Sequence, residues 1–475
     1  MSEITVMKKE MKTAPDRKQG FTLIELLVAI SILGTMASLI LFALAGAQTD
    51  ARVARTRSTI SKLNEIVLQR WEEYRYRAVN VTLPPALQTN VVNGAATSAA
   101  LAKPVSPREL ARVRMVMLRD MMRMELPDRA SDVLFGPTEY TVAFRNPAAP
   151  SGTAAVNLPR PIPAGWGVIY NALRSRIQGL KNDPRYAANW ASANMVNIND
   201  PAQGFSVSAL APSTGPAFLG NPPSRVESTL PAWTEAIQSS ELLYLIVSTS
   251  NYNGSSALEQ FRPTEIGDTD DDGLLEFIDA WGQPIVWLRW PAGYSGDLVR
   301  YAGADAMDPL KTDWRYRAQV GGAAVDEDWH PRTLVPLIMS RGQDGQLGVI
   351  TDFFDSVNGR PPIAYATMTW PTASAGKPYG TGVYGVAGVH YGAAGPYYYP
   401  DPNFTYDYSS DLPNQTDSEK PWNIDGPRGA MHGFRRNQIG AIPKFIDFNG
   451  LDTPGTIVND VWQDNITSHD IILEP

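Results

Sequence analysis

Residues 20–49 read GFTLIELLVAISILGTMASLILFALAGAQT, and this stretch decides the architecture of the chain. From residue 26 to residue 49 there are 24 consecutive uncharged residues. As a helix this run rises about 36 Å, at ~1.5 Å per residue, and a bilayer has a hydrocarbon core of ~30 Å. The stretch therefore predicts one transmembrane helix.

The leader before this helix, residues 1–20, predicts its orientation. It holds five basic residues and three acidic ones. An excess of Lys and Arg marks the cytoplasmic side of a membrane segment. We therefore expect a single pass through the inner membrane, with a cytoplasmic N-terminus and the remainder of the chain outside the cytoplasm.

Glu25 is a carboxylate near one end of an otherwise apolar span, where an unpaired charge costs about 3 kcal/mol. One interpretation is that its side chain simply reaches the lipid headgroups. However, residues 20–27, Gly-Phe-Thr-Leu-Ile-Glu-Leu-Leu, follow a basic leader, and this combination closely resembles the signal sequence of type IV prepilins and pseudopilins.

The resemblance implies a processing route and an assembly role. A membrane-bound prepilin peptidase would cut between Gly20 and Phe21 and methylate the new amino terminus. Glu25 would then neutralise the amino group of Phe21 on a neighbouring subunit, inside a low-dielectric bundle where pairing matters most. An alternative is ordinary secretion with cleavage after residues 43–45, Ala-Leu-Ala, but the apolar run is longer than a secretory signal and begins behind a charge.

The helix is expected to continue past the membrane, so that residues 21–77 form one helix, interrupted at most near Gly34 or Gly46. Residues 50–77 contain no Gly or Pro and carry an apolar stripe at helical spacing. The stripe consists of Ile60, Leu63, Val67, Trp71 and Tyr74. An ordinary membrane anchor would predict the same stripe.

Residues 78–260 predict a mainly helical insert. Ser106, Pro107 and Glu109 are typical of a helix start, and the helix over 110–125 is rich in Met, which favours a place in the core. Further helices are expected over 166–180 and, largely buried, over 233–247. Links rich in Pro, Ala and Ser are expected at 145–163 and 201–231.

Residues 265–279, EIGDTDDDGLLEFID, carry seven acidic side chains and no basic one. The spacing suits a calcium loop, because alternate side chains can converge on one ion and the Gly at the sixth position permits a sharp turn. The alternative is a solvated acidic turn. The candidate ligands are Asp268, Asp270, Asp272, the carbonyl of Leu274, Glu276 and Asp279.

Three later segments resemble the C-terminal part of the major pseudopilin of type II secretion: DAWGQPIVWLRW at 279–290, LVPLIMSRGQDGQLG at 334–348 and DNITSHDI at 464–471. The resemblance implies a small antiparallel sheet and a second, weaker calcium site at Ser340 and Asp464. The chain departs from the family at Ala280, where Pro is usual, and in the long separation between the second and third segments.

These segments divide the remainder of the chain. Residues 261–348 hold the acidic loop and the pseudopilin-like sheet, residues 349–460 are an insertion rich in Gly, Pro and Tyr, and residues 461–475 close the chain. Tyr-rich surfaces suit protein binding, and such composition also suits irregular loops. The fold class is therefore α+β, with a long N-terminal transmembrane helix, a helical inserted subdomain and a C-terminal antiparallel sheet of pilin type.

Composition argues against an enzyme and a nucleic-acid binder. The chain has no Cys, only four His and a net charge of −8, which excludes thiol chemistry and leaves no globally basic surface. No phosphate-binding or hydrolase motif occurs. The favoured hypothesis is a structural pilin or pseudopilin subunit in a pilus or secretion pseudopilus, with other such subunits as partners. The alternatives are a minor, tip-located adhesion pilin and a tethered enzyme.

Overall fold

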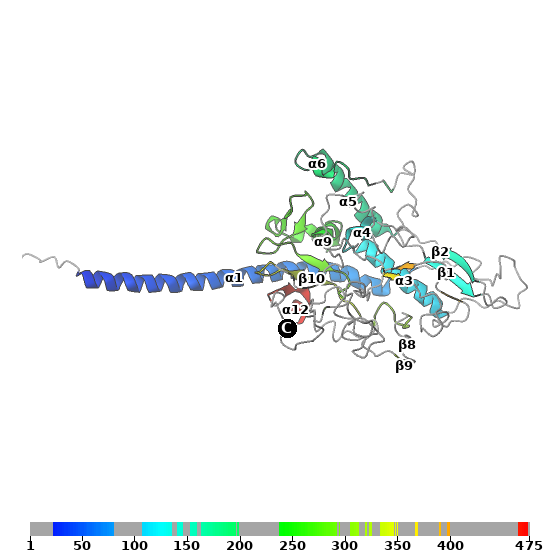
Figure 1. The fold of residues 1–475 in the computed structure, drawn as a ribbon, viewed down its shortest axis with the longest axis horizontal. Coiled ribbons are helices and arrows are strands. Elements are labelled where there is room, and N and C mark those ends of the chain that lie inside the picture. The colour runs from blue at the N-terminus through cyan, green and yellow to red at the C-terminus, as the bar shows by residue number, and fades with distance from the viewer. Residues whose placement is uncertain are drawn as a thin grey trace, which may run out of the picture. The chain divides into compact units, whose positions relative to one another are not determined.

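One helix, α1 (Leu23–Tyr76), runs for 54 residues without a break (Figure 1). This computed structural model describes residues 22–79, 107–134, 140–145, 153–158, 163–195, 197–198, 237–291, 294, 305–312, 319–320, 323–324, 333–345, 347, 349, 366–368, 389–390, 397–399 and 464–473. The chain divides into two compact units, one ending at Arg52 and the other beginning at Val53. The long helix is as predicted, and neither Gly34 nor Gly46 interrupts it.

The second unit contains the last part of α1, and the predicted apolar stripe is buried there. Ile60, Leu63 and Val67 are fully buried, and Trp71 and Tyr74 are nearly so. Polar side chains also join this segment of α1 to residues 246–265 of the unit. The stripe was correctly identified from its spacing, since residues three and four apart share one face of a helix.

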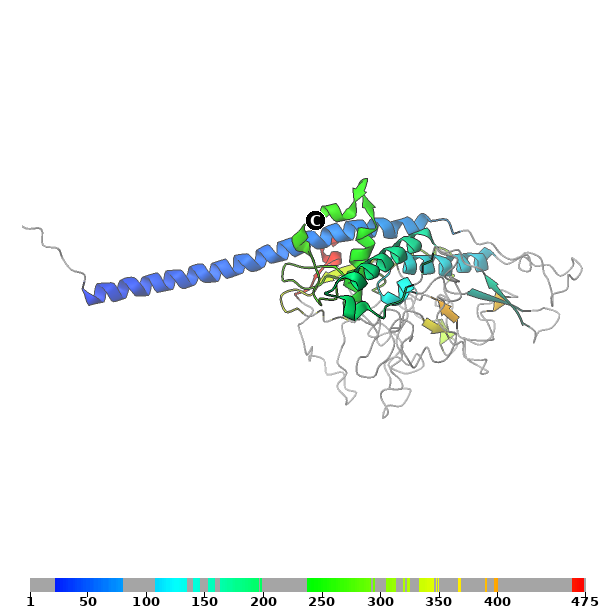
Figure 2. The same ribbon diagram turned by 90° about the horizontal axis from the view of Figure 1, so that it is seen from above.

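Polar contacts hold α1 against the segments around residues 246–265. Thr59 donates its hydroxyl proton to Glu265 at 2.7 Å, and Lys62 forms an ion pair with the same carboxylate at 3.2 Å. Arg70 donates to the hydroxyl of Ser250 at 2.8 Å. Figure 2 shows this part of α1 beside the other helices of the unit.

The helices of the insert form most of the core around α1. Helix α3 (Pro107–Glu125) places Met115, Met117, Met122 and Met124 in buried positions, so the Met-rich face does fill the core. The other helices are α4 (Ala130–Leu134), α5 (Ala164–Asn182), α6 (Ala187–Trp190) and α9 (Gln238–Ser248). The expected helices over 110–125, 166–180 and 233–247 correspond to α3, α5 and α9 within a few residues, with residues 233–236 outside the described part.

The C-terminal sheet is three-stranded and antiparallel, in the order β14 (Ile466–Thr467), β10 (Leu337–Ser340), β7 (Val286–Leu288). Side chains alternate between its faces, as strand geometry requires. Trp287 and Ile338 face the large core, and a smaller cluster of Val286, Leu288, Leu337 and Met339 covers the other face. Helix α12 (Ser468–Leu473) follows β14 directly and packs on β10.

The insert is less purely helical than predicted. Strands β1 (Tyr140–Arg145) and β2 (Thr153–Leu158) form a hairpin, so part of the expected link at 145–163 is a strand. Strand β12 (Val389–His390) pairs with β1 and comes from the insertion at 349–460, most of which lies outside the described residues. Such pairing across about 245 positions leaves no local signal in the sequence, because the partner strand supplies the hydrogen bonds.

The remaining described elements are short. Most form two-stranded antiparallel pairs. They are β3 (Asn251–Tyr252), β4 (Ser255–Ser256), η4 (Ala257–Gln260), η5 (Pro263–Glu265), β5 (Ile266–Gly267), β6 (Glu276–Phe277), β8 (Gln319–Val320), β9 (Ala323–Ala324), β11 (Ala366–Met368) and β13 (Tyr397–Tyr399).

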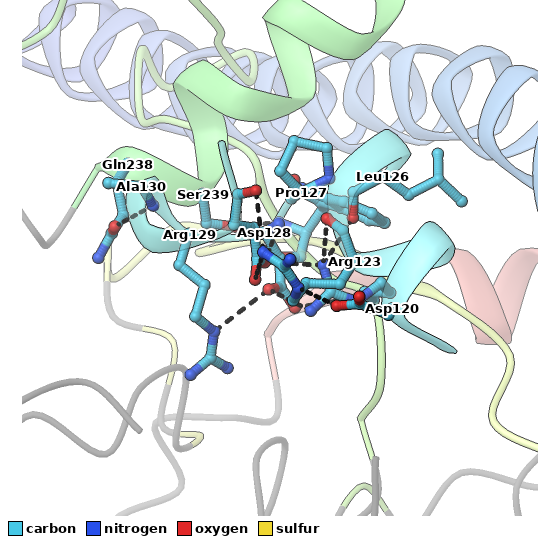
Figure 3. A network of polar contacts seen from close by, with 12 residues as sticks. Asp120, Arg123, Leu126, Pro127, Asp128, Arg129, Ala130, Gln238 and Ser239 are labelled. Carbon is cyan, nitrogen blue, oxygen red and sulfur yellow. Dashed lines mark hydrogen bonds and ion pairs between the residues drawn. The ribbon is translucent and has the colours of Figure 1, made fainter. Parts of the chain in front are cut away.

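A buried ionic network joins α3, α4, the turn between them (residues 126–129) and the residue that follows β7 (Figure 3). Arg289 is 2% exposed and donates to Asp132 at 2.8 Å, to the carbonyl of Leu126 at 2.8 Å, and pairs with Asp128 at 3.2 Å. Arg123 pairs with Asp120 at 3.0 Å. Buried charges of opposite sign need such partners, because desolvation otherwise costs more than the fold can supply.

A second set of contacts in Figure 3 attaches the turn between α3 and α4, residues 126–129, and the first residue of α4 to α9. Gln238 accepts a hydrogen bond from the backbone of Ala130 at 2.8 Å. Ser239 exchanges hydrogen bonds with the backbone of Trp287, whose indole N–H donates to the carbonyl of Pro127 at 3.1 Å. The sheet and the helices of the insert therefore form one continuous body around α9.

Candidate functional site

The first candidate site is the N-terminal part of α1, in the unit that ends at Arg52. Its large apolar side chains are exposed along the entire stretch, and it is the one helix in the described part of the chain that is long and apolar enough to span a membrane. Glu25 is its only charged residue before Asp50. The exposed residues include Leu23, Ile24, Leu26, Leu27, Val28, Ile30, Ile32, Leu33, Met36, Leu39, Ile40, Leu41, Phe42 and Leu44.

Glu25 also helps to cap the start of the helix, which begins at Leu23. Its carboxylate accepts hydrogen bonds from the backbone N–H and the hydroxyl of Thr22, each at 2.9 Å, and the Thr22 hydroxyl in turn accepts from the Glu25 backbone N–H at 3.3 Å. This reciprocal arrangement is a capping box, which satisfies backbone donors at a helix start. The predicted cleavage residues Gly20 and Phe21 lie outside the described residues.

The second candidate site is the acidic loop between β5 and β6. Gly273 has a positive φ of +93°, and a Cβ there would lie 2.3 Å from Leu180, so the sharp turn needs Gly at this position. Asp268 shapes the turn, since its two carboxylate oxygens accept from the backbone N–H groups of Asp272 at 3.1 Å and Gly273 at 3.0 Å. The hydroxyl of Tyr186 also donates to Asp268 at 3.2 Å.

Three carboxylates converge beside this loop. Oxygen atoms of Glu241, Asp270 and Asp272 all lie within 4.8 Å of one another. Asp270 and Asp272 were among the predicted ligands. Glu241, on α9, was not, although an acidic residue inside the buried stretch SSELLYLIV was a signal that could have identified it.

Burial shifts the pKa values of two carboxylates of the acidic loop. Asp272 and Glu276 are 4% and 0% exposed. Loss of hydration, reinforced by the neighbouring charges of Asp270 and Asp268, raises the pKa of Asp272 to about 7 and that of Glu276 to about 7. One oxygen of each of these two carboxylates is buried and has no hydrogen-bond partner. The arrangement suits a bound cation.

Other predicted ligands of the loop have different surroundings. The Leu274 backbone N–H donates to Asp272 at 2.7 Å. Asp279 accepts from the backbone N–H groups of Trp281 at 2.8 Å and Gln283 at 2.9 Å, and from the hydroxyl of Ser340 at 2.6 Å. Asp279 therefore closes the turn before β7 and connects it to β10, outside the group of three carboxylates.

The third candidate site lies where β10 ends. Asp464 accepts hydrogen bonds from the backbone N–H groups of Gln343 at 2.6 Å and Asp344 at 3.0 Å. The structure thus brings the loop after Ser340 into contact with the C-terminal segment across more than a hundred residues. Ser340 pairs with Ile466 in the sheet, and its own hydroxyl is engaged with Asp279.

Comparison with known proteins identifies one match. Residues 15–41 match the prokaryotic N-terminal methylation motif, the motif of prepilins. No curated protein and no solved structure matches the chain. The motif match covers the predicted cleavage position, Glu25 and the start of α1, and it supports the type IV prepilin and pseudopilin family and a type IV pilin-like precursor.

Proposed function

We propose that this chain is a structural pilin-like or pseudopilin-like subunit, with no catalytic role, that prepilin peptidase cleaves after Gly20. The mature subunit assembles through α1 into a type IV pilus or a type II secretion pseudopilus. The observation that carries the proposal is the methylation motif over residues 15–41, placed on a helix whose apolar half is exposed and holds one carboxylate.

An exposed apolar helix of this length must be buried away from water, in lipid or against other helices. Its side chains run from Leu23 to Leu44 without a charged residue other than Glu25. Before assembly, the lipid core of the inner membrane covers it. In a filament, the same helices of neighbouring subunits replace the lipid, and van der Waals packing between them drives association.

Glu25 gives this packing a register. A carboxylate in an apolar bundle is costly unless a positive charge lies beside it. Cleavage after Gly20 creates such a charge at the amino group of Phe21. Within one chain Glu25 caps its own helix through Thr22. In the assembled filament, we propose, its carboxylate pairs with the amino group of Phe21 on a neighbouring subunit.

The head, from Val53 onward, lies outside the cytoplasm in this proposal, because the basic leader stays inside. The support for the pseudopilin assignment is the order β14-β10-β7 and the contact of Asp464 with the loop after Ser340. These three segments are the ones whose sequence resembles the major pseudopilin.

The test is assembly of a Glu25→Val variant in the native cell. We expect the precursor to be cleaved and the protein to remain in the membrane, while the variant is absent from sheared filaments or from crosslinked pseudopilus oligomers. Glu72→Val is the matched control, since Glu72 is an exposed acid on the same helix. Equal incorporation of the Glu25→Val and Glu72→Val variants would contradict the proposed role of Glu25.

A further inference from the structure

We infer that Glu241, Asp270 and Asp272 bind one divalent cation of the calcium type, which connects α9 to the acidic loop. This site draws its ligands from two parts of the chain about thirty residues apart. It does not depend on the proposed role of α1 in assembly.

The spacing of the oxygens suits calcium. Ca²⁺ binds oxygen ligands at about 2.3–2.6 Å, so two ligands on opposite sides of the ion are separated by about 5 Å. The three carboxylate oxygens lie within 4.8 Å of one another. Mg²⁺ binds at about 2.0–2.1 Å with nearly ideal octahedral geometry, which a mixture of loop and helix ligands meets less readily.

Two buried carboxylate oxygens favour a cation at this place. Asp272, a member of the group of three, has one carboxylate oxygen that is buried and has no hydrogen-bond partner. The second oxygen of Glu276, in the adjacent strand β6, is also buried without a partner. A buried carboxylate oxygen without a hydrogen-bond partner destabilises a fold, and native structures generally avoid this. A cation among these oxygens would remove the cost.

The loop is already shaped for the ion by other contacts. Asp268 holds the turn by accepting from the backbone of Asp272 and Gly273, and the indole N–H of Trp190 donates to the carbonyl of Asp272 at 2.7 Å. Asp270 is only partly buried. It therefore lies on the solvent side, where water molecules can enter and complete the six to eight oxygen ligands that Ca²⁺ takes.

This assignment changes the ligand set predicted from sequence. Glu241 takes the place that a linear loop would give to Asp279, whose carboxylate is occupied by two backbone N–H groups and Ser340. Asp268 acts on the loop conformation. The ion thus bridges a helix of the core and a surface loop, so its removal is expected to destabilise the head as a whole.

The test is terbium luminescence of the full-length protein in detergent, with Tb³⁺ as the probe and excitation at the tryptophan band. The contact between Trp190 and Asp272 places an indole donor beside the site. We expect sensitised emission that Ca²⁺ displaces. Glu241→Gln and Asp270→Asn are each expected to weaken Tb³⁺ and Ca²⁺ binding at least about 10-fold, since even indirect support of a ligand is worth 10–100-fold.

Two control variants make the result specific. Asp183→Asn removes a partly exposed carboxylate that pairs with Arg185 and should leave binding unchanged. Asp464→Asn, at the loop after Ser340, should also retain the emission. The melting temperatures of the variants in EDTA distinguish loss of the cation site from loss of the fold. Without the ion, Glu241→Gln removes a negative charge beside Asp270 and Asp272, so this variant should melt no lower than wild type.

The inference is overturned if wild type gives no sensitised emission, or if Glu241→Gln and Asp270→Asn bind Tb³⁺ as wild type does. It is also overturned if the Asp464→Asn variant alone loses the emission. If Glu241→Gln melts lower in EDTA, Asp270→Asn decides the question, since Asp270 is partly exposed and its replacement does not disturb the core.

Discussion

Gly342 shows how closely the C-terminal segment approaches the loop after β10. Its φ is +65°, and a Cβ built there would lie 2.4 Å from the backbone oxygen of Asp464. Only Gly fits a position that combines a left-handed backbone with contact against another backbone. The contact therefore fixes how residues 464–467 enter the sheet beside β10.

We predict that Gly342→Ala destabilises the protein by about 2 kcal/mol or more, because the left-handed conformation alone costs roughly 1–2 kcal/mol in a residue with a Cβ. The melting temperature should fall by roughly 4 °C or more. Gly179→Ala is the control: Gly179 lies in α5, nothing lies within 4 Å of its Cβ position, and Ala should raise stability by roughly 0.5–1 kcal/mol. Equal melting temperatures for wild type and Gly342→Ala would show that Asp464 does not approach Gly342.

At the residue scale, the sequence indicated two of the three carboxylates that converge beside the acidic loop. Asp270 and Asp272 follow from the spacing of acidic residues in one loop. Glu241 could not be placed beside them, because only the packing of α9 on β6 brings it there. Asp279 occupies a position suited to a ligand in sequence, yet in the fold its oxygens bind the turn and Ser340.

At the scale of elements, the helices followed the sequence closely and the strands did not. Helices α1, α3, α5 and α9 each form their backbone hydrogen bonds within one stretch of sequence, so they need no distant partner. Strands β1, β2 and β12 depend on one another across the insert. Strand β14 is two residues long, and no pattern of alternation can be read from so short a segment.

A substitution of Arg289 measures how much the buried ionic network contributes to the stability of the head. We predict that Arg289→Met destabilises the head by about 3–5 kcal/mol, because it leaves Asp128 and Asp132 buried without their shared cation. Thermal melting should show a loss of roughly 6 °C or more. The exposed pair of Arg185 and Asp183 provides the comparison, and Arg185→Met should change the melting temperature by roughly 2 °C or less. Similar losses for the two variants would contradict the importance of the network.

At the scale of the whole molecule, the sequence predicted a membrane helix continuing into a head of mixed helices and antiparallel strands. The apolar run from Leu26 predicts the membrane helix, and the stripe that ends at Tyr74 predicts its continuation into the head. The small sheet of β7, β10 and β14 falls in the three segments from which a small antiparallel sheet was expected. The pairing of β12 with β1 was not predictable, since it joins strands far apart in the sequence.

The most direct test of the proposed assembly is the N-terminal residue and intact mass of the protein recovered from its native cell envelope. We predict a chain that starts at Phe21 with a methylated amino group, which is the charge that Glu25 requires in an assembled filament. A chain that starts at Gly46, as after ordinary secretory cleavage, would contradict it. So would an uncleaved chain that still begins at Met1.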